Sequence, residues 1–309
     1  MTDTMRALRF HAYGDPRDVL VLEEAPVSNP GPGHIRVKVH GCGLNPADWA
    51  LCRGLFQSEL PRGIGLDVSG VVDAVGDGVS DVKVGDPVLG AADYNHYLSA
   101  GAADFAILHA WGAVPPGLDL THAAALPMAI ETASRCLDGL DLAPGQTLLV
   151  HAAGTVIGFA AVQIGRMRGA HVVATAGPTL AGRIEALGVP VTAYGDGMIE
   201  RVRALCGAPD RIFDAGPISG VLPDLVAVAG DADHVLTVSN HGPAAEALGV
   251  RNSFASGRLR NDALGEFAAL AAAGKFAVPV ARTYPLTDWR EAMELSLSFR
   301  AGGKLVLLP

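Results

Sequence analysis

The chain has 309 residues, enough for about two domains of the usual size. Half of the residues are hydrophobic and 18% are charged, a composition that excludes a disordered chain. The formal charge of −9 argues against nucleic-acid binding, because no basic excess is available to hold a polyphosphate backbone. No apolar stretch reaches the roughly 18 residues of a membrane span, and the first ten residues lack the pattern of a signal peptide. We therefore expect a cytoplasmic protein without a membrane partner, whose four separated cysteines are free thiols.

Residues 1 to 120 are rich in short strand-like runs that are broken by glycine. Residues 36–40 alternate between polar and apolar side chains, and residues 70–75 form a short apolar run. Residues 82–89 (VKVGDPVL) are expected as two strand-like halves around a Gly-Asp turn. Short strands separated by turns predict a small β-barrel.

Residues 121–260 alternate between strands and helices. The expected strands are apolar runs at residues 147–151, 171–174, 211–213 and 235–238. Helical stretches follow the first three of them, at residues 158–169, 180–187 and 220–228. Strands that alternate with helices predict successive βαβ units and a doubly wound parallel sheet.

Residues 261–309 return to the character of the first segment. A helix is expected at residues 264–273 and another near 288–298, with strands at residues 277–282 and 304–308. We therefore expect this segment to rejoin residues 1–120 in one domain, with residues 121–260 as the second domain.

The turn after the first strand of the second domain carries the clearest chemical signal. A strand that leads through a tight turn into a helix directs free backbone N–H groups at an anion. The dinucleotide-binding fingerprint needs small residues at three positions, which are Ala153, Thr155 and Gly158 here. Only the third is glycine, and the Thr155 side chain stands where the backbone would approach the pyrophosphate. The turn alone is therefore compatible with cofactor binding and with a plain strand–helix turn.

The end of the second strand in this domain bears on which cofactor is bound. An NAD-specific site would place Asp or Glu there, but the residues are Thr175, Ala176 and Gly177. An end without acidic residues tolerates a 2′-phosphate. Arg183 follows about one helical turn later and would either contact this phosphate or be a solvated helix residue.

At these residues the chain resembles the zinc-independent quinone oxidoreductase family of the medium-chain dehydrogenases/reductases, nearly from end to end. The matching segments are residues 43–48 with Arg53-Gly54, 65–72, 84–88, 124–127 with 131–133, 150–163, 284–286 and 303–306. The resemblance implies a GroES-like β-barrel catalytic domain joined to a Rossmann domain. It also implies a homodimer that transfers hydride from NADPH to a quinone or an α,β-unsaturated carbonyl compound.

The resemblance also bears on whether a metal is bound. Zinc-dependent relatives have a Cys ligand where Asn45 stands and a His ligand where Leu66 stands, and neither residue here binds zinc. The structural loop with four cysteines is missing as well. We therefore expect no metal.

The family's site residues can be assigned to positions in this chain. Asn45 is expected beside the nicotinamide, where its amide donates to the carboxamide or to the substrate carbonyl. Tyr94 and His96 would shape a pocket or donate a proton, although a surface loop is the alternative reading. Asp48 and Asp67 are expected in structural ion pairs or turn contacts. The cofactor contacts implied are Asn45, Thr132, Ala153, Gly154, Thr155, Val156, Ile157, Thr175, Ala176, Gly177, Arg183, Tyr194, Ser239, Asn240 and Lys304.

Two other functions remain open at this point. One is a specialised biosynthetic enoyl reductase or cyclase that acts on a compound such as a polyketide intermediate. The other is a non-catalytic scaffold or sensor that binds cofactor poorly, for which Thr155 is the best argument.

Overall fold

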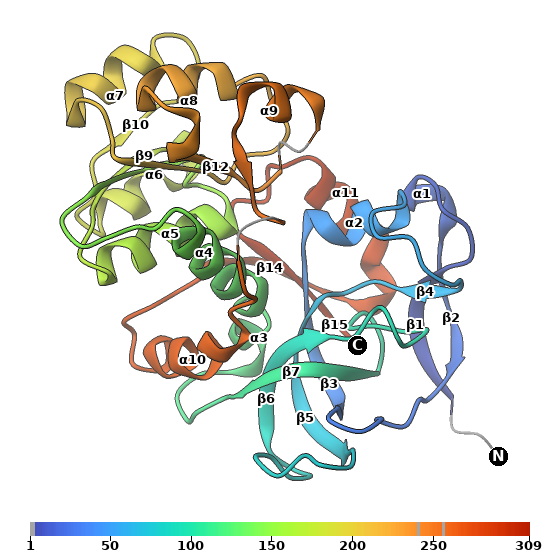
Figure 1. Ribbon diagram of the computed structural model, residues 1–309. Helices are drawn as coiled ribbons and strands as arrows, with labels where there is room; N and C mark the ends of the chain where they lie inside the picture. The colour runs from blue at the N-terminus through green and yellow to red at the C-terminus, as the bar shows by residue number, and fades with distance from the viewer. Residues whose placement is uncertain (1–3, 240–241, 255–256) are drawn as a thin grey trace. The chain divides into compact units, whose positions relative to one another are not determined.

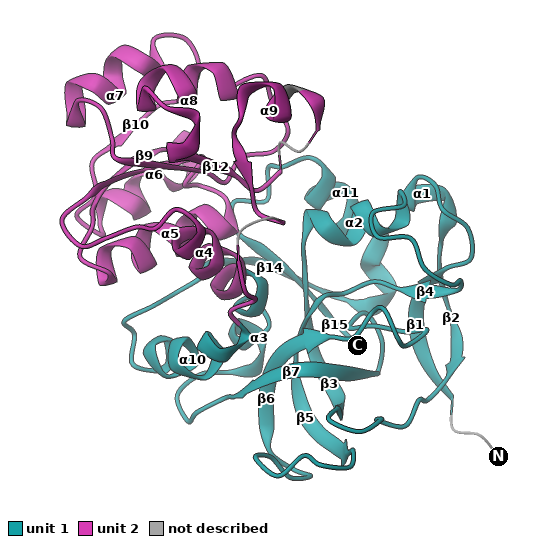
Figure 2. Ribbon diagram, in the orientation of Figure 1, with its two compact units in different colours: residues 1–128, 261–309 teal, residues 129–260 magenta. Residues whose placement is uncertain are grey.

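The chain folds into two units, which Figures 1 and 2 show in the computed structural model of residues 4–239, 242–254 and 257–309. Unit 1 comprises residues 1–128 and 261–309, and unit 2 comprises residues 129–260. The first boundary therefore falls after residue 128 rather than after residue 120. The reason is that α3 (Leu120–Ala123) belongs to unit 1, where the Ser69 hydroxyl donates a hydrogen bond to the Leu120 carbonyl at 2.5 Å.

Unit 1 is built around a closed barrel and contains both ends of the chain (Figure 2). Its strands are β1 (Thr4–Phe10), β2 (Leu20–Pro26), β3 (Ile35–Leu44), β4 (Arg62–Gly63), β5 (Asp67–Val75), β6 (Pro87–Ala92), β7 (Phe105–Ala113), β14 (Val280–Pro285) and β15 (Lys304–Leu308). Its helices are α1 (Pro16–Val19), α2 (Pro46–Cys52), α3, α10 (Leu264–Ala272) and α11 (Trp289–Leu297). Strands β3, β5, β6 and β7 pair in sequence, and β7 pairs again with β3. The expected barrel is therefore confirmed.

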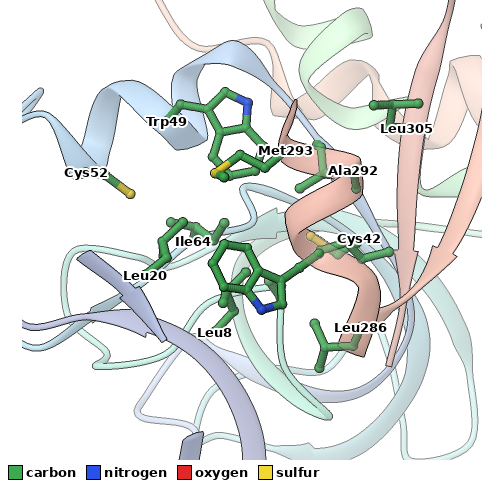
Figure 3. Packing of buried hydrophobic residues seen from close by; sticks show 14 of the residues in the cluster. Leu8, Leu20, Cys42, Trp49, Cys52, Ile64, Leu286, Ala292, Met293 and Leu305 are labelled. Atoms are coloured by element: carbon green, nitrogen blue, oxygen red, sulfur yellow. The ribbon is translucent and has the colours of Figure 1, made fainter. Parts of the chain in front are cut away.

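The barrel strands follow the pattern that the sequence predicts. In β3 the side chains of Ile35, Val37 and Val39 are buried, whereas Lys38 and His40 are exposed. The C-terminal strand β15 pairs antiparallel with β3, so the last segment of the chain rejoins unit 1 as expected. A second core packs helices α2 and α11 against β1 and β15, with Trp49 and Met293 among its buried residues (Figure 3).

Two of the expected strands in unit 1 have different bounds. Residues 82–86 form a turn and not a strand, because the Asp86 carboxylate accepts a hydrogen bond from the Lys83 N–H at 3.0 Å, and β6 begins only at Pro87. Residues 277–279 likewise precede β14, which begins at Val280. Burial of Phe276 and Val278 explains the apolar character of the region before this strand.

Unit 2 is a six-stranded parallel sheet with helices on both faces. Its strands are β8 (Thr147–His151), β9 (His171–Thr175), β10 (Val191–Thr192), β11 (Arg211–Asp214), β12 (Val235–Thr237) and β13 (Arg251–Asn252). Its helices are α4 (Pro127–Gly139), which begins at the end of unit 1, α5 (Val156–Met167), α6 (Pro178–Glu185), α7 (Met198–Cys206), α8 (Leu222–Ala229) and α9 (Pro243–Leu248). The strand order β10-β9-β8-β11-β12-β13 is that of a Rossmann sheet, as expected.

The core of unit 2 explains why these strands are short, continuous apolar runs. Leu149, Ile212 and Val235 on three neighbouring strands pack against Val202 of α7 and Leu225 of α8. Both faces of a parallel sheet are covered by helices, so its strands do not alternate between polar and apolar residues. Among the described residues, no helix has the length and hydrophobicity that a membrane span requires.

Candidate active site

A buried polar centre in unit 1 joins three residues that are far apart in the sequence. The Lys304 ammonium donates hydrogen bonds to Asn45 Oδ1 at 2.5 Å and to Asp67 Oδ2 at 2.6 Å. The Asn45 amide in turn donates to Asp67 Oδ2 at 3.0 Å. All three side chains are nearly inaccessible to solvent, so the ion pair lies in a region of low dielectric constant.

The ends of three strands position this centre. Asn45 follows β3 and precedes helix α2, Asp67 is the first residue of β5, and Lys304 is the first residue of β15. Gly43 allows the close approach, because a Cβ at this position would lie 2.6 Å from Lys304 Cε and 2.2 Å from the Ala124 carbonyl oxygen. Asp67 Oδ1 also accepts a hydrogen bond from the Met128 N–H at 2.8 Å, so both oxygens of its carboxylate are hydrogen-bonded.

A second buried carboxylate, that of Asp48, supports the centre from helix α2. It accepts backbone hydrogen bonds from Asn45 at 2.7 Å, from Gly65 at 2.8 Å and from Leu66 at 3.1 Å. Burial raises the pKa of this carboxyl to about 6, and the neighbouring charge of Asp67 adds to the shift, whereas the backbone hydrogen bonds and Lys304 oppose it. Asp67 thus forms an ion pair and Asp48 a turn contact, as expected for both.

The geometry changes the role expected for Asn45. Its two amide hydrogens are directed at Asp67 Oδ2 and at the Gly43 carbonyl, and its oxygen accepts from Lys304. An amide NH₂ group has only two hydrogens to donate, so none remains for a carboxamide or a substrate carbonyl in this conformation. The structure brings Asn45 and Lys304 together in the polar centre. There Asn45 bonds to both charged groups, the Lys304 ammonium and the Asp67 carboxylate, and orients them.

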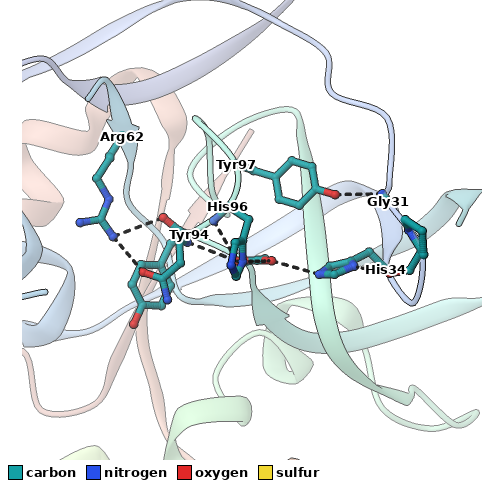
Figure 4. Close-up of polar contacts among 9 residues, drawn as sticks. Gly31, His34, Arg62, Tyr94, His96 and Tyr97 are labelled. Carbon is teal, nitrogen blue, oxygen red and sulfur yellow. Dashed lines mark hydrogen bonds and ion pairs between the residues drawn. The ribbon is translucent and has the colours of Figure 1, made fainter. Parts of the chain in front are cut away.

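Tyr94 and His96, the two residues expected in a substrate-side loop, differ in burial and in hydrogen bonding. The Tyr94 side chain is half-buried, and its hydroxyl makes no hydrogen bond within the part of the chain that the structure describes. The His96 ring is 78% exposed and bonds through Nδ1 to Asp93 Oδ2 at 2.9 Å (Figure 4). Burial would raise the pKa of the Asp93 carboxyl, but hydrogen bonds from the side chain and backbone of His96 hold it below its usual range. His96 therefore anchors a surface loop, and Tyr94 keeps a free donor.

The glycine turn of unit 2 has the geometry of an anion site. Helix α5 begins after Thr155, and its first residues Val156 and Ile157 have N–H groups without a partner inside the helix. Gly158 lies at the closest approach of helix and strand, because a Cβ there would lie 2.6 Å from the Ala152 carbonyl oxygen. Gly154 is less crowded, since a Cβ at that position would meet no atom closer than 3.7 Å.

Thr155 serves the turn itself. Its hydroxyl accepts a hydrogen bond from the Gly158 N–H at 3.0 Å, which caps helix α5. The same hydroxyl lies 3.0 Å from the Ala152 carbonyl oxygen and 3.1 Å from that of Ala215, just beyond strand β11. The side chain thus ties the turn to the neighbouring strand, and its position is explained without a ligand.

The end of strand β9 is small and free of acidic groups, as the sequence indicates. The Thr175 hydroxyl accepts from the Ala152 N–H at 3.1 Å and lies 2.8 Å from His151 Nδ1. His151 is buried, and burial lowers its pKa while the nearby Asp214 opposes the shift. Gly177 faces Tyr194, because a Cβ there would lie 3.1 Å from the tyrosine hydroxyl.

The remaining residues expected to contact the cofactor differ in burial and in their hydrogen-bond partners. Arg183 on α6 is exposed and makes no ion pair within the described residues. The Thr132 hydroxyl donates to Glu131 Oε2 at 3.0 Å and is buried, and Ser239 follows strand β12. Ala153 and Ala176 are buried at the ends of β8 and β9. Asn240 lies outside the described residues.

Two features of unit 1 were not found from the sequence. One is the ion pair of Lys304 with Asp67, which joins residues 237 positions apart. The other is the buried guanidinium of Arg62, which bonds to the Tyr94 carbonyl. The only sequence signal for the first was the segment Gly303–Val306, which carries the family resemblance but no information about a partner.

Known protein families match both units. Residues 31–119 match the model of the alcohol dehydrogenase GroES-like domain, and residues 185–307 match that of the zinc-binding dehydrogenase. The chain is 34% identical to the quinone oxidoreductase of Homo sapiens over 178 residues, which are 56% of this chain and 53% of the relative. It thus spans about half the length of the curated relatives it matches.

Solved structures match over almost the whole length. The quinone oxidoreductase from Coxiella burnetii has a TM-score of 0.85 at 24% identity, and the match covers 99% of this chain and 100% of that one. An NAD-dependent alcohol dehydrogenase has a TM-score of 0.84 at 27% identity, with the same coverage of both chains. A GroES-like barrel and a Rossmann sheet in one chain are the combination that these two dehydrogenase family models describe. Over both units the chain is thus similar to medium-chain dehydrogenases/reductases, and among them to quinone oxidoreductases.

The buried ion pair predicts a strongly non-additive mutant cycle. Lys304→Met leaves the Asp67 carboxylate buried without its counter-charge, and we expect a loss of about 3–5 kcal/mol in the free energy of unfolding. Asp67→Asn removes the charge from the other side, and the double variant should cost clearly less than the sum of the two single variants. Urea unfolding can be followed by tryptophan fluorescence, because Trp49, Trp111 and Trp289 all lie in unit 1. Additive losses would contradict a direct pair.

The raised pKa of Asp48 predicts a specific pH dependence. The folded state keeps a proton on this carboxyl between about pH 4 and about pH 6, where the unfolded chain has lost it. The stabilising contribution is therefore complete below about pH 4 and lost as the pH rises through about 6, by about 3 kcal/mol in total. The difference in unfolding free energy between the wild type and Asp48→Asn should fall over this range and stay constant above it. A difference independent of pH would rule out Asp48 as the titrating group.

The capping role of Thr155 predicts how its substitutions affect stability. Thr155→Ala removes the acceptor for the Gly158 N–H and should lower the free energy of unfolding by about 1 kcal/mol. Thr155→Ser keeps the hydroxyl and serves as the matched control, for which we expect near wild-type stability. Thermal unfolding monitored by circular dichroism compares the three proteins. An alanine variant as stable as the serine variant would show that the cap contributes nothing.

Proposed function

We propose that this protein is an NADPH-dependent, zinc-independent reductase that transfers hydride to a quinone or an α,β-unsaturated carbonyl compound. The observation that carries the proposal is the position of the Lys304 ammonium, held between Asn45 and Asp67. Asn45 stands where zinc-dependent relatives have a cysteine ligand. A buried monovalent cation at this position would repel a divalent one and already neutralises the carboxylate. No group of three or more His, Cys, Asp or Glu side chains in the described ranges is arranged to hold a metal.

The residues of unit 2 fit a nicotinamide dinucleotide. The N–H groups of Val156 and Ile157 at the start of α5 would hold its pyrophosphate, as the fingerprint requires. The acid-free end of β9 and the unpaired Arg183 favour a 2′-phosphate over a free 2′-hydroxyl. Tyr194, 55% exposed and close to Gly177, offers a ring face to the adenine base. When bound, the cofactor supplies the hydride.

For quinone reduction the protein mainly has to position the acceptor beside the hydride donor. The reaction needs the acceptor carbon about 3–3.5 Å from the hydride donor and a hydrogen-bond donor for the oxygen that gains charge. We assign the donor role to the half-buried Tyr94 hydroxyl, which has no partner within the described residues, and not to His96, whose ring is 78% exposed on a surface loop. Lys304 and Asp67 hold Asn45 in one orientation, and the charges of the two groups compensate each other. The proposal includes a cytoplasmic homodimer, which the family resemblance also predicts.

The proposal is tested by cofactor binding and turnover in one set of experiments. Titration of NADPH fluorescence should show tighter binding than NADH, and 1,4-naphthoquinone should be reduced at a rate that a chelator does not change. Arg183→Ala should raise the Michaelis constant for NADPH by about tenfold, equivalent to roughly 1–2 kcal/mol for one charged hydrogen bond, and leave that for NADH nearly unchanged.

Each other function has a distinct outcome in these experiments. NADPH binding without quinone turnover would favour a specialised biosynthetic reductase or cyclase. Failure to bind either nicotinamide cofactor would favour a non-catalytic scaffold. Stoichiometric zinc, tied to activity, would contradict the metal-free chemistry.

A further inference from the structure

Arg62 in strand β4 is a buried cation without an acidic partner. Its side chain is among the most deeply buried in the chain, and within the described residues it forms no ion pair with a carboxylate. Its hydrogen bonds go to neutral oxygens: Nη1 donates to the Phe56 carbonyl at 2.6 Å, and Nη2 donates to the Tyr94 carbonyl and to Asn95 Oδ1, both at 3.3 Å. Its Nε has no hydrogen-bond partner in the part of the chain that the structure describes. Burying a guanidinium in this way is costly, so the residue needs an explanation beyond stability.

The Arg62 guanidinium links two loop segments that are far apart in the sequence. Phe56 belongs to the segment between α2 and β4, and Tyr94 and Asn95 belong to the segment after β6. Figure 4 shows Arg62 beside Tyr94. The Arg62 guanidinium carbon also lies 5.4 Å from the centre of the Tyr94 ring. A planar group with five N–H donors in a fixed fork can hold two backbone carbonyls and a ring at once, whereas a lysine ammonium cannot.

These segments adjoin the polar centre of unit 1. The Ala92 N–H, two residues before Tyr94, donates to the Leu66 carbonyl at 3.0 Å, and the Leu66 N–H donates to Asp48. Tyr94 and Leu66 pack against the same hydrophobic cluster. The free hydroxyl of Tyr94 therefore belongs to a residue whose backbone and ring are both held by Arg62, beside the residues that support Asn45.

The segment after β6 has separate anchors that do not involve Arg62. His34 Nε2 bonds to Asp93 Oδ2 at 3.0 Å, and the Tyr97 hydroxyl accepts from the Gly31 N–H at 2.8 Å (Figure 4). These contacts tie both ends of the segment to the loop before β3. Removal of Arg62 should therefore loosen Tyr94 and Asn95 without unfolding the barrel.

We propose that Arg62 is a positioning residue for the acceptor: it fixes the Tyr94 ring and hydroxyl in the place where they contact the quinone. This inference rests on the proposed function, which assigns Tyr94 the hydrogen bond to the acceptor oxygen. Arg62 does not touch the acceptor. It acts through Tyr94 and through the segment that begins at Phe56.

The test compares Arg62→Lys, which keeps the charge but cannot bridge, with Tyr94→Phe and with the double variant. We expect Arg62→Lys to raise the Michaelis constant for 1,4-naphthoquinone about tenfold and to leave that for NADPH unchanged. Because Arg62 acts through Tyr94, Arg62→Lys should have little further effect on kcat/KM in the Tyr94→Phe background. Arg36→Lys is the control for an arginine elsewhere in the barrel: Arg36 also bonds to a carbonyl, that of Ser28, and lies over the Phe105 ring, but it is paired with Asp73.

Hydrogen exchange of the backbone amides gives a second readout that needs no turnover. In Arg62→Lys the amides of residues 54–60 and 94–95 should exchange faster together, while those of helix α5 in unit 2 stay unchanged. Unchanged exchange in these segments, or fully additive effects in the kinetic cycle, would overturn the inference. If the wild type reduces no quinone, the proposed function fails, and exchange alone decides whether Arg62 fixes the Tyr94 segment.

Discussion

The buried ion pair between Lys304 and Asp67 is the interaction on which the architecture of unit 1 depends. Removing both charges from water costs a large desolvation free energy. This cost is offset only where the two groups meet at hydrogen-bond distance and their remaining donors and acceptors are also hydrogen-bonded. The N–H of Met128 and the amide of Asn45 satisfy the carboxylate. The ends of β3, β5 and β15 must therefore arrive in register, and Gly43 provides the space that the lysine side chain needs.

The same constraint explains the chemistry that unit 1 can perform. A centre in which each polar group is bonded to another is rigid, and the ammonium of Lys304 in it is compensated by the Asp67 carboxylate. Such a centre suits a reaction in which a hydride arrives from elsewhere and the protein only orients the acceptor and stabilises the charge that develops on it. The half-buried Tyr94, whose hydroxyl has no partner among the described residues, is the group that we propose for the contact with the acceptor.

In unit 2 the groups that we propose for anion binding are backbone N–H groups and not side chains. The hydroxyls of Thr155 and Thr175 are bonded to the turn and to its neighbouring strands. These side chains shape the turn after β8 and leave the first N–H groups of α5 available. An anion can be held there although two of the three fingerprint positions are not glycine, since Gly158 is the position with the closest contacts.

Periodicity and turn residues in the sequence were sufficient to determine the barrel, the parallel sheet and the return of the last segment to unit 1, because these patterns reflect local backbone preferences and burial. The motifs also singled out Asn45 and the glycine turn as candidates for function. Only the tertiary structure decided what their side chains do. Asn45 meets a lysine 259 positions away, and its amide is consumed in that contact. Thr155 bonds to a carbonyl beyond a strand 60 positions away, and Arg62 joins two loops that no local pattern connects. Hydrogen-bond partners of this kind depend on which strand ends the fold brings together, and that is not encoded in any short stretch of the chain.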